Sequence, residues 1–288
     1  MNELTRKIWP PALLDPSGLR EAGAQAAHKQ GADRTSGRGQ TMIIDKGLGR
    51  HGFADLLETV GDYIDCIKIG FGTAPLSKTE LLLHKIEQAK LRGLLIMPGG
   101  TLLEAAVRQE VVPEFFEAVC TLGFNAIEVS DGTIELNRSL RTALIKEGLR
   151  NGLRVVTEYG KKLSGSLVDA ADLAETAEAD LAAGADHVTV EARESGVGVG
   201  VFDEHGNCRE DMLEGICRFV SDPSRLMWEA PLKHQQVLLL QIFGAGVHLG
   251  NIPPGDALAL ETMRRGLRSD TFGFGQLSDY RKRIEYMI

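Results

Sequence analysis

From residue 41 onward, short apolar runs alternate with longer stretches in which apolar residues recur at helical spacing. Eight runs are rich in β-branched residues and end in polar residues or glycine, a pattern typical of buried strands. These runs are residues 42–44, 63–69, 94–97, 126–129, 154–157, 187–190, 226–228 and 247–249. Helices are predicted between them. Ser77-Lys78-Thr79-Glu80 has the form of a capping box before a helix over 81–92. Two more helices are expected over 169–185 and 257–265.

Strict alternation of strands and helices predicts a parallel sheet. Eight such units in about 240 residues favour a closed (β/α)8 TIM barrel over an open sheet. We therefore expect one barrel domain over residues 41–288, preceded by an N-terminal extension over 1–40. In a barrel of this kind the catalytic groups lie in the loops after the strands, so the strand ends are the place to search for function.

The N-terminal extension has a different composition from the barrel. Gly, Ala, Gln, Ser and Arg dominate residues 18–40, with little apolar periodicity, and we expect a flexible segment. A transit peptide is the alternative interpretation. The extension has no apolar leader, and the chain has no run of about 18 apolar residues, so we expect a cytoplasmic protein without a membrane-spanning helix.

Composition narrows the function classes. The 288 residues are 43% hydrophobic and 25% charged, as in ordinary globular proteins. A net charge of -8 argues against a nucleic-acid partner. The four cysteines form no C-x-x-C pair, so neither a zinc site nor a disulfide framework is predicted.

A glutamate stands at the end of four successive predicted strands. These residues are Glu128, Glu158, Glu191 and Glu229. Neighbouring strands lie about 4.8 Å apart, so the four carboxylates can converge on one point, where they repel one another unless a cation or a proton separates them. An all-oxygen site of this kind suits Mg²⁺. The alternative is simple ion pairing across the barrel mouth. Glu229 is the best candidate for a structural role, because Pro231 turns the chain directly after it.

Cationic side chains occupy the same predicted barrel mouth. They are Lys46, Lys68, Lys161, Lys162 and Arg193. A lysine at the end of an apolar strand is usually held there for its charge, because burying an unpaired ammonium group is costly. Five cations at one mouth therefore favour a binding site for a polyanionic substrate. Each one could instead be a structural partner of a strand-end carboxylate.

Two glycine-rich loops could bind an oxyanion through backbone N–H groups. One is Pro98-Gly99-Gly100-Thr101, and the other covers residues 196–200. Plain turn geometry explains either loop equally well. Residues 47–52 also fit G-x-G-x-x-G, the dinucleotide-binding fingerprint. Asp45 and Lys46 separate that motif from its strand, and eight repeated βα units exceed the six strands of a dinucleotide fold, so we favour no nucleotide role.

The strand-end motifs occur in a recognisable order: Asp45-Lys46-Gly47, Gly61-Asp62-Tyr63-Ile64-Asp65, Lys68, Gly70-Phe71-Gly72-Thr73, Pro98-Gly99-Gly100-Thr101-Leu102, Ile127-Glu128-Val129-Ser130-Asp131-Gly132, Thr157-Glu158-Tyr159-Gly160-Lys161-Lys162, Glu191-Ala192-Arg193-Glu194-Ser195-Gly196, and residues 261–268. Taken together, they resemble the phosphosulfolactate synthase family. The resemblance covers residues 41–273 and leaves the extension outside.

The resemblance implies a (β/α)8 barrel that catalyses Mg²⁺-dependent addition of sulfite to phosphoenolpyruvate. The product would be (2R)-2-phospho-3-sulfolactate, which leads toward coenzyme M or sulfolactate. The family also includes heat-stress-associated proteins of plants. The resemblance further implies a homo-oligomer, with a trimer as one candidate. Two alternatives stay open: a barrel enzyme acting on another enolpyruvate or phosphorylated hydroxyacid, and a non-catalytic scaffold.

The resemblance also implies roles for individual residues. Glu128, Glu158 and Glu191 would hold Mg²⁺, and the matching family position makes Lys162 the acid that protonates C2 of the substrate. Lys161 and the cation would lower the pKa of Lys162 toward neutrality. The remaining cations, and the amides of Gly99 and Gly100, would bind the phosphate, carboxylate or sulfite.

One departure concerns the loop after the sixth strand. Val197 and Val199 occupy positions where a basic residue is expected in the synthases.

Overall fold

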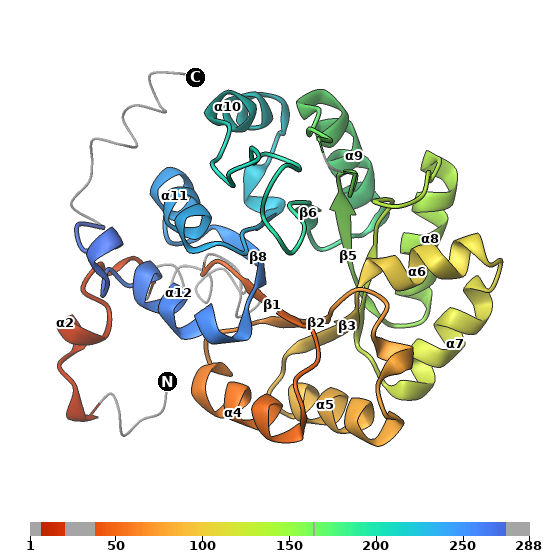
Figure 1. Ribbon diagram of the computed structural model, residues 1–288, viewed down its shortest axis with the longest axis horizontal. Helices are drawn as coiled ribbons and strands as arrows, with labels where there is room; N and C mark the ends of the chain where they lie inside the picture. Colours follow the sequence, from red (N-terminus) through yellow and green to blue (C-terminus); the bar gives the residue numbers. More distant parts are fainter. Residues whose placement is uncertain (1–6, 21–37, 164, 275–288) are drawn as a thin grey trace.

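Eight strands form where the eight apolar runs were predicted. The computed structural model describes residues 7–20, 38–163 and 165–274, and within them the strands are β1 (Thr41–Asp45), β2 (Cys66–Ile69), β3 (Leu95–Pro98), β4 (Ala126–Val129), β5 (Arg154–Tyr159), β6 (Val188–Val190), β7 (Leu226–Glu229) and β8 (His248–Ile252). All paired strands are parallel, and helices surround them in a ring (Figure 1). The predicted TIM barrel is confirmed.

The barrel closes through a side chain at one seam. Backbone pairing runs in the order β3-β2-β1-β8-β7-β6-β5-β4, which leaves β3 and β4 as neighbouring edges without a ladder between them in the described chain. Asn125, just before β4, fills this gap. Its Oδ1 accepts a hydrogen bond from the Ile96 amide at 2.7 Å, and its Nδ2 donates to the Leu94 carbonyl at 3.0 Å. One carboxamide thus replaces part of the missing ladder.

Alternating side chains of the strands build two separate apolar layers. A small cluster fills the barrel interior: Met42, Cys66, Met97, Ala126, Val156 and Met227. The intervening residues, such as Ile43, Ile67 and Ile127, face the helices and belong to the main core. The inner cluster closes the barrel floor, so polar groups further along the same inward positions lie at the mouth.

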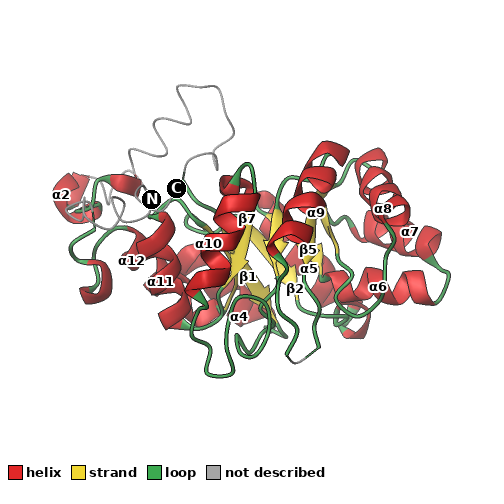
Figure 2. Ribbon diagram, turned by 90° about the horizontal axis from the view of Figure 1, so that it is seen from above, coloured by secondary structure: helices red, strands yellow, loops and turns green. Residues whose placement is uncertain are grey.

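The helices that cover the barrel are α4 (Arg50–Val60), α5 (Thr79–Leu91), α6 (Gly100–Arg108), α7 (Val112–Leu122), α8 (Arg138–Arg150), α9 (Ala170–Ala183), α10 (Glu210–Phe219), α11 (Lys233–Phe243) and α12 (Ala257–Arg264). Figure 2 shows them on both sides of the strands. The predicted helices over 169–185 and 257–265 correspond to α9 and α12. Asp169 caps α9 by accepting from the amides of Ala171 and Asp172, as its position at the predicted helix start favours.

The predicted capping box before α5 is wrong. The helix begins at Thr79 with Lys78 at the N-cap, and no side chain caps it. Residues Ala74–Leu76 form a short 3-10 turn, and the Ser77 hydroxyl donates to the Thr73 carbonyl of that turn at 3.3 Å. The hydroxyl of Ser77 is therefore bonded to the preceding turn, and the N-cap residue is Lys78 in place of Ser77.

Part of the N-terminal extension packs against α12. Arg20 is buried and donates to Glu261 Oε2 at 2.8 Å, and Arg265 Nη1 donates to the Leu14 carbonyl at 2.8 Å. The short helix α2 (Pro11–Leu14) accordingly lies beside α12 at the edge of the ring (Figure 1). Residues 21–37 lie outside the described residues, and their flexibility stays a prediction.

None of the helices in the described part of the chain is long and apolar enough to cross a membrane. The cytoplasmic location and the homo-oligomeric state stay predictions.

Candidate active site

Four glutamates meet at the carboxyl end of the barrel. Glu128, Glu158 and Glu229 lie on β4, β5 and β7, and Glu191 directly follows β6. Each is 1% exposed. Their positions alternate with core residues that face the helices, so the pleat directs all four carboxylates inward. Because the strands are parallel, these inward ends share one mouth, as the sequence predicted.

Lys68 lies at the centre of these carboxylates. Its Nζ donates to Glu128 Oε1 at 2.9 Å, to Glu158 Oε2 at 3.1 Å and to Glu229 Oε1 at 3.1 Å. Burial alone would lower the pKa of Lys68, but the three carboxylates outweigh it and hold that pKa well above its ordinary value. Lys68 thus stays charged as part of the cluster. It is a structural partner of the strand-end carboxylates, the predicted alternative to substrate binding.

Lys162 reaches the same cluster from the loop after β5. Its Nζ lies 2.9 Å from Glu158 Oε1, 3.5 Å from Glu191 Oε2 and 3.3 Å from the Thr101 hydroxyl. Burial opposes its charge, yet Glu158 and Glu191 raise the pKa of Lys162 above its ordinary value. Lys161 therefore does not lower the pKa of Lys162, and the expected lowering by a bound cation stays a prediction. Lys161 faces away, toward the carbonyls of Asp131 and Ile134.

The carboxylates differ in their ease of ionisation. Burial and the charge of Glu158 raise the pKa of Glu128 to about 7, although Lys68 lowers it. Burial also raises the pKa of Glu191, together with the charges of Glu158 and Glu229, well above the ordinary value. Glu158 differs, because Lys162 and Lys68 overcome its burial and hold its pKa well below the usual range. The cluster carries more negative charge than its two lysines offset.

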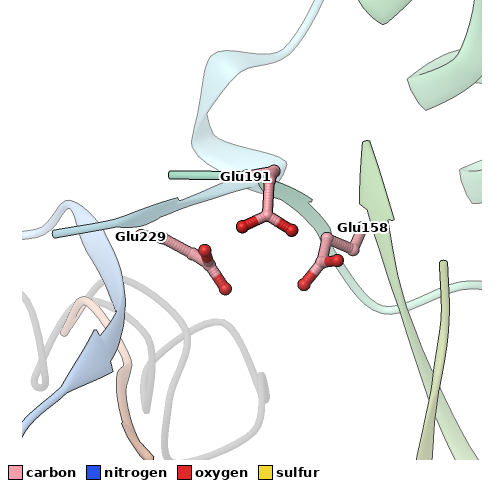
Figure 3. A group of neighbouring side chains, drawn as sticks. All are labelled: Glu158, Glu191 and Glu229. Atoms are coloured by element: carbon pink, nitrogen blue, oxygen red, sulfur yellow. The ribbon is translucent and has the colours of Figure 1, made fainter. Parts of the chain in front are cut away.

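Three of the four carboxylates form the group in the described chain that could hold a metal ion. One oxygen each from Glu158, Glu191 and Glu229 lies within 4.8 Å of the others, and their carboxylates converge in Figure 3. This set differs from the predicted one, which had Glu128 in place of Glu229. Position separates these two glutamates, since both oxygens of Glu128 are engaged, by Lys68 and by the Gly100 amide at 2.8 Å, and those of Glu229 are engaged in the same way.

Two oxygens of this group have unmet hydrogen-bonding capacity. Glu158 Oε1 and Glu191 Oε2 are buried and accept no hydrogen bond from a described residue. Glu158 Oε1 does lie near Lys162 Nζ, at ion-pair distance but without hydrogen-bond geometry. Glu229 is held by Lys68 and by the Ala192 amide at 3.0 Å. The free oxygens are the natural ligand atoms of the group.

The other predicted cations lie at the rim and outside this cluster. Lys46 forms an exposed ion pair with Glu194 at 3.3 Å, which links the loops after β1 and β6 across the mouth. Arg193 is exposed, and its backbone amide donates to Glu191 Oε1 at 2.5 Å. In the same loop Val199 is fully buried and Val197 is half-buried.

The predicted oxyanion cradle at Gly99 and Gly100 already has its amides paired. Gly99 donates to the Ile69 carbonyl at 2.8 Å, and Gly100 donates to Glu128. A Cβ on Gly100 would lie 2.3 Å from the Ser130 hydroxyl oxygen. Glycine at position 100 therefore allows close packing between β3 and β4. Its amide, at the start of α6, binds the carboxylate of Glu128.

The dinucleotide fingerprint is likewise occupied by the chain. Asp45 Oδ1 accepts from the amides of Gly47 and Leu48 at 2.8 and 2.7 Å, and Lys85 pairs with Asp45 Oδ2 at 2.6 Å. A carboxylate fills the place that a phosphate would take in a dinucleotide fold.

Sequence reasoning missed two residues that shape the site. Glu104, buried on α6, accepts from the amides of Gly132 and Thr133 at 3.2 and 2.7 Å and so fixes the loop after β4. Arg141, buried on α8, donates to the Glu158 carbonyl at 3.0 Å and pairs with Asp180. Both lie on helices, away from the strand ends where we searched, and only their charge at a core position could have signalled them.

The comparisons with known proteins agree on one family. Residues 29–270 match the model of the family described as (2R)-phospho-3-sulfolactate synthase (ComA). A phosphosulfolactate synthase of Methanothermobacter thermautotrophicus is 42% identical over 238 residues, which is 82% of this chain and 92% of that protein. One of Bacillus subtilis is 38% identical over 236 residues, with 81% and 92% covered.

Solved structures show the same fold at low identity. A 3-hexulose-6-phosphate synthase aligns with a TM-score of 0.52 at 14% identity, over 80% of this chain and 100% of that one. The YdjI aldolase from Escherichia coli K12 aligns with a TM-score of 0.52 at 13% identity, over 95% and 93%. These likenesses bear on the barrel alone.

Proposed function

The chain belongs to the (2R)-phospho-3-sulfolactate synthase family, and from this premise we propose that it catalyses Mg²⁺-dependent addition of sulfite to phosphoenolpyruvate to give (2R)-2-phospho-3-sulfolactate. The observation that carries the proposal is the contact of Lys162 with Glu158 and Glu191 at the barrel mouth. An ammonium group and buried carboxylates lie side by side there, and this addition requires a proton donor next to a bound cation.

The residues of the mouth fit a divalent cation. With all four carboxylates ionised, Lys68 and Lys162 offset two of the four negative charges. A bound divalent cation would offset the other two and favour the ionised forms of Glu128 and Glu191, whose pKa values are raised without it. The unmet oxygens of Glu158 and Glu191, together with Glu229, supply hard oxygen ligands of the kind Mg²⁺ prefers. When bound, Mg²⁺ would supply Lewis-acid stabilisation of the negative charge that develops on the substrate carboxylate.

The chain's own residues would supply the proton. Sulfite sulfur attacks C3 of the enol phosphate, the C–S bond forms, and the electron pair of the double bond moves toward C2. The Lys162 ammonium group, kept charged by Glu158 and Glu191, delivers a proton to C2 and is recharged from solvent. The phosphate ester stays intact, so no leaving group is needed.

The rim cations would receive the anions. Lys46 and Arg193 stand on the loops after β1 and β6 at the mouth, where they can attract phosphoenolpyruvate and offset its repulsion of sulfite. Lys161 holds the loop after β4 and so contributes to the shape of that side. The deep lysine, Lys68, would act indirectly by keeping the carboxylates in place.

A different enolpyruvate or phosphorylated hydroxyacid is the second candidate substrate. The inward packing of Val199 favours it, because this position in the loop after β6 then offers no charge to an anion. The scaffold alternative is weaker, since an interaction surface needs no buried ring of four glutamates and two lysines.

The test is a ³¹P NMR time course with phosphoenolpyruvate, sulfite and Mg²⁺. We expect a new phosphoester resonance that requires sulfite. Lys162→Met should lower kcat by about 100-fold or more, the usual contribution of a general acid, with a smaller change in KM. Lys161→Met is the matched control, because it removes the adjacent ammonium group outside the cluster, and its kcat should fall far less.

An unchanged phosphoenolpyruvate signal with the folded wild-type protein would refute this substrate assignment. Equal losses of kcat in the two lysine variants would refute the role of Lys162 as the acid.

A further inference from the structure

Asn251 has an unusual backbone at the carboxyl end of β8. Its φ is +52°, a left-handed conformation that few residues other than glycine adopt. The register between β1 and β8 is irregular at this point: Thr41 pairs with Leu249, and Ile43 pairs with Ile252. Two residues of β8, Gly250 and Asn251, therefore stand opposite the single residue Met42. This arrangement is a β-bulge, a device that redirects a side chain at barrel rims and beside active sites.

The bulge keeps Asn251 on the inner side of the barrel. Met42 belongs to the inner cluster, and a Cβ added to Gly250 would lie 2.7 Å from Met42 Cε. Leu249 and Ile252, the residues on either side of the bulge, belong to the outer core against the helices. Asn251 thus continues the inward row of β8 by one position toward the mouth.

The carboxamide of Asn251 is buried and incompletely bonded. The residue is 3% exposed, and its Oδ1 has no hydrogen-bond partner in the described part of the chain. An orphaned buried oxygen costs about 1–3 kcal/mol, so its retention calls for a ligand. Glu158 Oε1 and Glu191 Oε2 share this condition at the same end of the barrel.

The strand order brings Asn251 close to Glu229, the third glutamate of the group with Glu158 and Glu191. On β7 and β8, Glu229 pairs with Gly250, and the Ala230 amide donates to the Gly250 carbonyl at 3.0 Å. Asn251 therefore lies one residue beyond Gly250, the partner of Glu229, on a strand that runs about 4.8 Å from β7. Oxygen-bearing side chains then follow one another on β5, β6, β7 and β8.

We infer that Asn251 supplies a fourth oxygen ligand to the divalent cation held by Glu158, Glu191 and Glu229. The inference rests on the proposed Mg²⁺ site and extends it. Side-chain amide oxygens are ordinary ligands of hard cations, and a neutral fourth ligand completes the site without adding charge. The cation site is thereby centred on β5–β8, whereas the sequence had placed it on β4–β6.

A purely conformational role is the competing explanation, because asparagine tolerates the left-handed region better than most residues. The two explanations differ for Asn251→Gly. Glycine adopts this backbone without strain and removes only the carboxamide, so a conformational role predicts no loss. Asn251→Asp retains an oxygen at the same position and is the matched variant.

The experiment titrates the purified full-length protein with Mn²⁺ alone and follows the loss of the free-Mn²⁺ EPR signal, without substrates. We expect Asn251→Gly to weaken Mn²⁺ binding about tenfold or more at unchanged melting temperature. Asn251→Asp should bind Mn²⁺ as tightly as the wild type or more tightly, and it decides the question if the glycine variant does not fold.

Wild-type affinity in the glycine variant, or weaker binding in the aspartate variant, would overturn the inference while leaving the proposed cation site in place. Absence of Mn²⁺ binding by the wild-type protein would overturn the cation site itself, and the ³¹P assay would then decide the proposed reaction separately.

Discussion

Replacing Lys68 by methionine tests how the charges of the barrel mouth are balanced. Methionine has a similar length and no charge, so the change leaves Glu128, Glu158 and Glu229 without their shared donor. All four side chains are at most 6% exposed, and solvent cannot replace the ammonium group. We expect the variant to fold with markedly lower stability.

The size of the effect follows from these contacts. At an effective dielectric constant near 20, one ion pair at 3 Å contributes roughly 5 kcal/mol, but desolvation of each buried ion opposes most of that gain. Removal of one partner from a buried pair typically costs about 3–5 kcal/mol. For a chain of this size 1 kcal/mol corresponds to about 2–4 °C, so we expect a drop in melting temperature of about 10 °C.

The assay is the melting temperature by circular dichroism at pH 8 and pH 6. Burial and the neighbouring charges raise the pKa of Glu128 to about 7 and that of Glu191 well above the ordinary value. A raised carboxyl pKa adds stability at low pH that is lost as the pH rises through the folded value. The variant should therefore regain stability at pH 6.

Lys85→Met is the matched control. Lys85 is buried and pairs with a single carboxylate, Asp45, which keeps two backbone amide donors after the change. Its melting temperature should fall by less than that of Lys68→Met, and its deficit from the wild type should be the same at pH 8 and pH 6. Equal losses in the two variants, or no recovery of Lys68→Met on acidification, would refute the argument that Lys68 neutralises a carboxylate cluster.

Two further predictions concern stability away from the mouth. Burial and nearby arginines lower the pKa of His187 to about 4, and burial and His187 lower that of His248 to about 3. Each neutral histidine thus contributes stability that is lost as the pH falls below about 6.5. Between pH 7 and 5 the free energy of unfolding of the wild type should fall by about 2 kcal/mol more than that of His187→Leu, as measured by thermal melts. Asn125→Ala should cost about 1–3 kcal/mol and speed hydrogen exchange at the Ile96 amide, and unchanged exchange there would contradict the bridging role.

The fold was accessible from the sequence because each strand is a short apolar run with a polar end. Alternation of these runs with helical stretches fixes the parallel barrel, and the barrel places all strand ends at one mouth. The convergence of Glu128, Glu158, Glu191 and Glu229 follows from that alone. Local pattern and global architecture agree, which is why the inference succeeded.

The assignment of individual ligands was not accessible in the same way. Glu128 and Glu229 occupy equivalent places in sequence, and each has both oxygens engaged. Only their three-dimensional positions show that Glu229 lies in the group with Glu158 and Glu191. The same holds for Lys161 and Lys162. They are adjacent in sequence, but Lys161 faces the loop after β4 and Lys162 faces the carboxylates, so Lys161 does not lower the pKa of Lys162 as expected.

The seam between β3 and β4 gives the charged cluster a second consequence. Besides the carboxamide of Asn125, the bonds from Lys68 on β2 and from the Gly100 amide after β3 to Glu128 on β4 all cross this seam. The same contacts that prepare the mouth for its ligands therefore act as a clasp on the barrel. Substitutions that change these contacts also weaken the association of β3 with β4. Evolution of a new specificity at this mouth is therefore coupled to the stability of barrel closure.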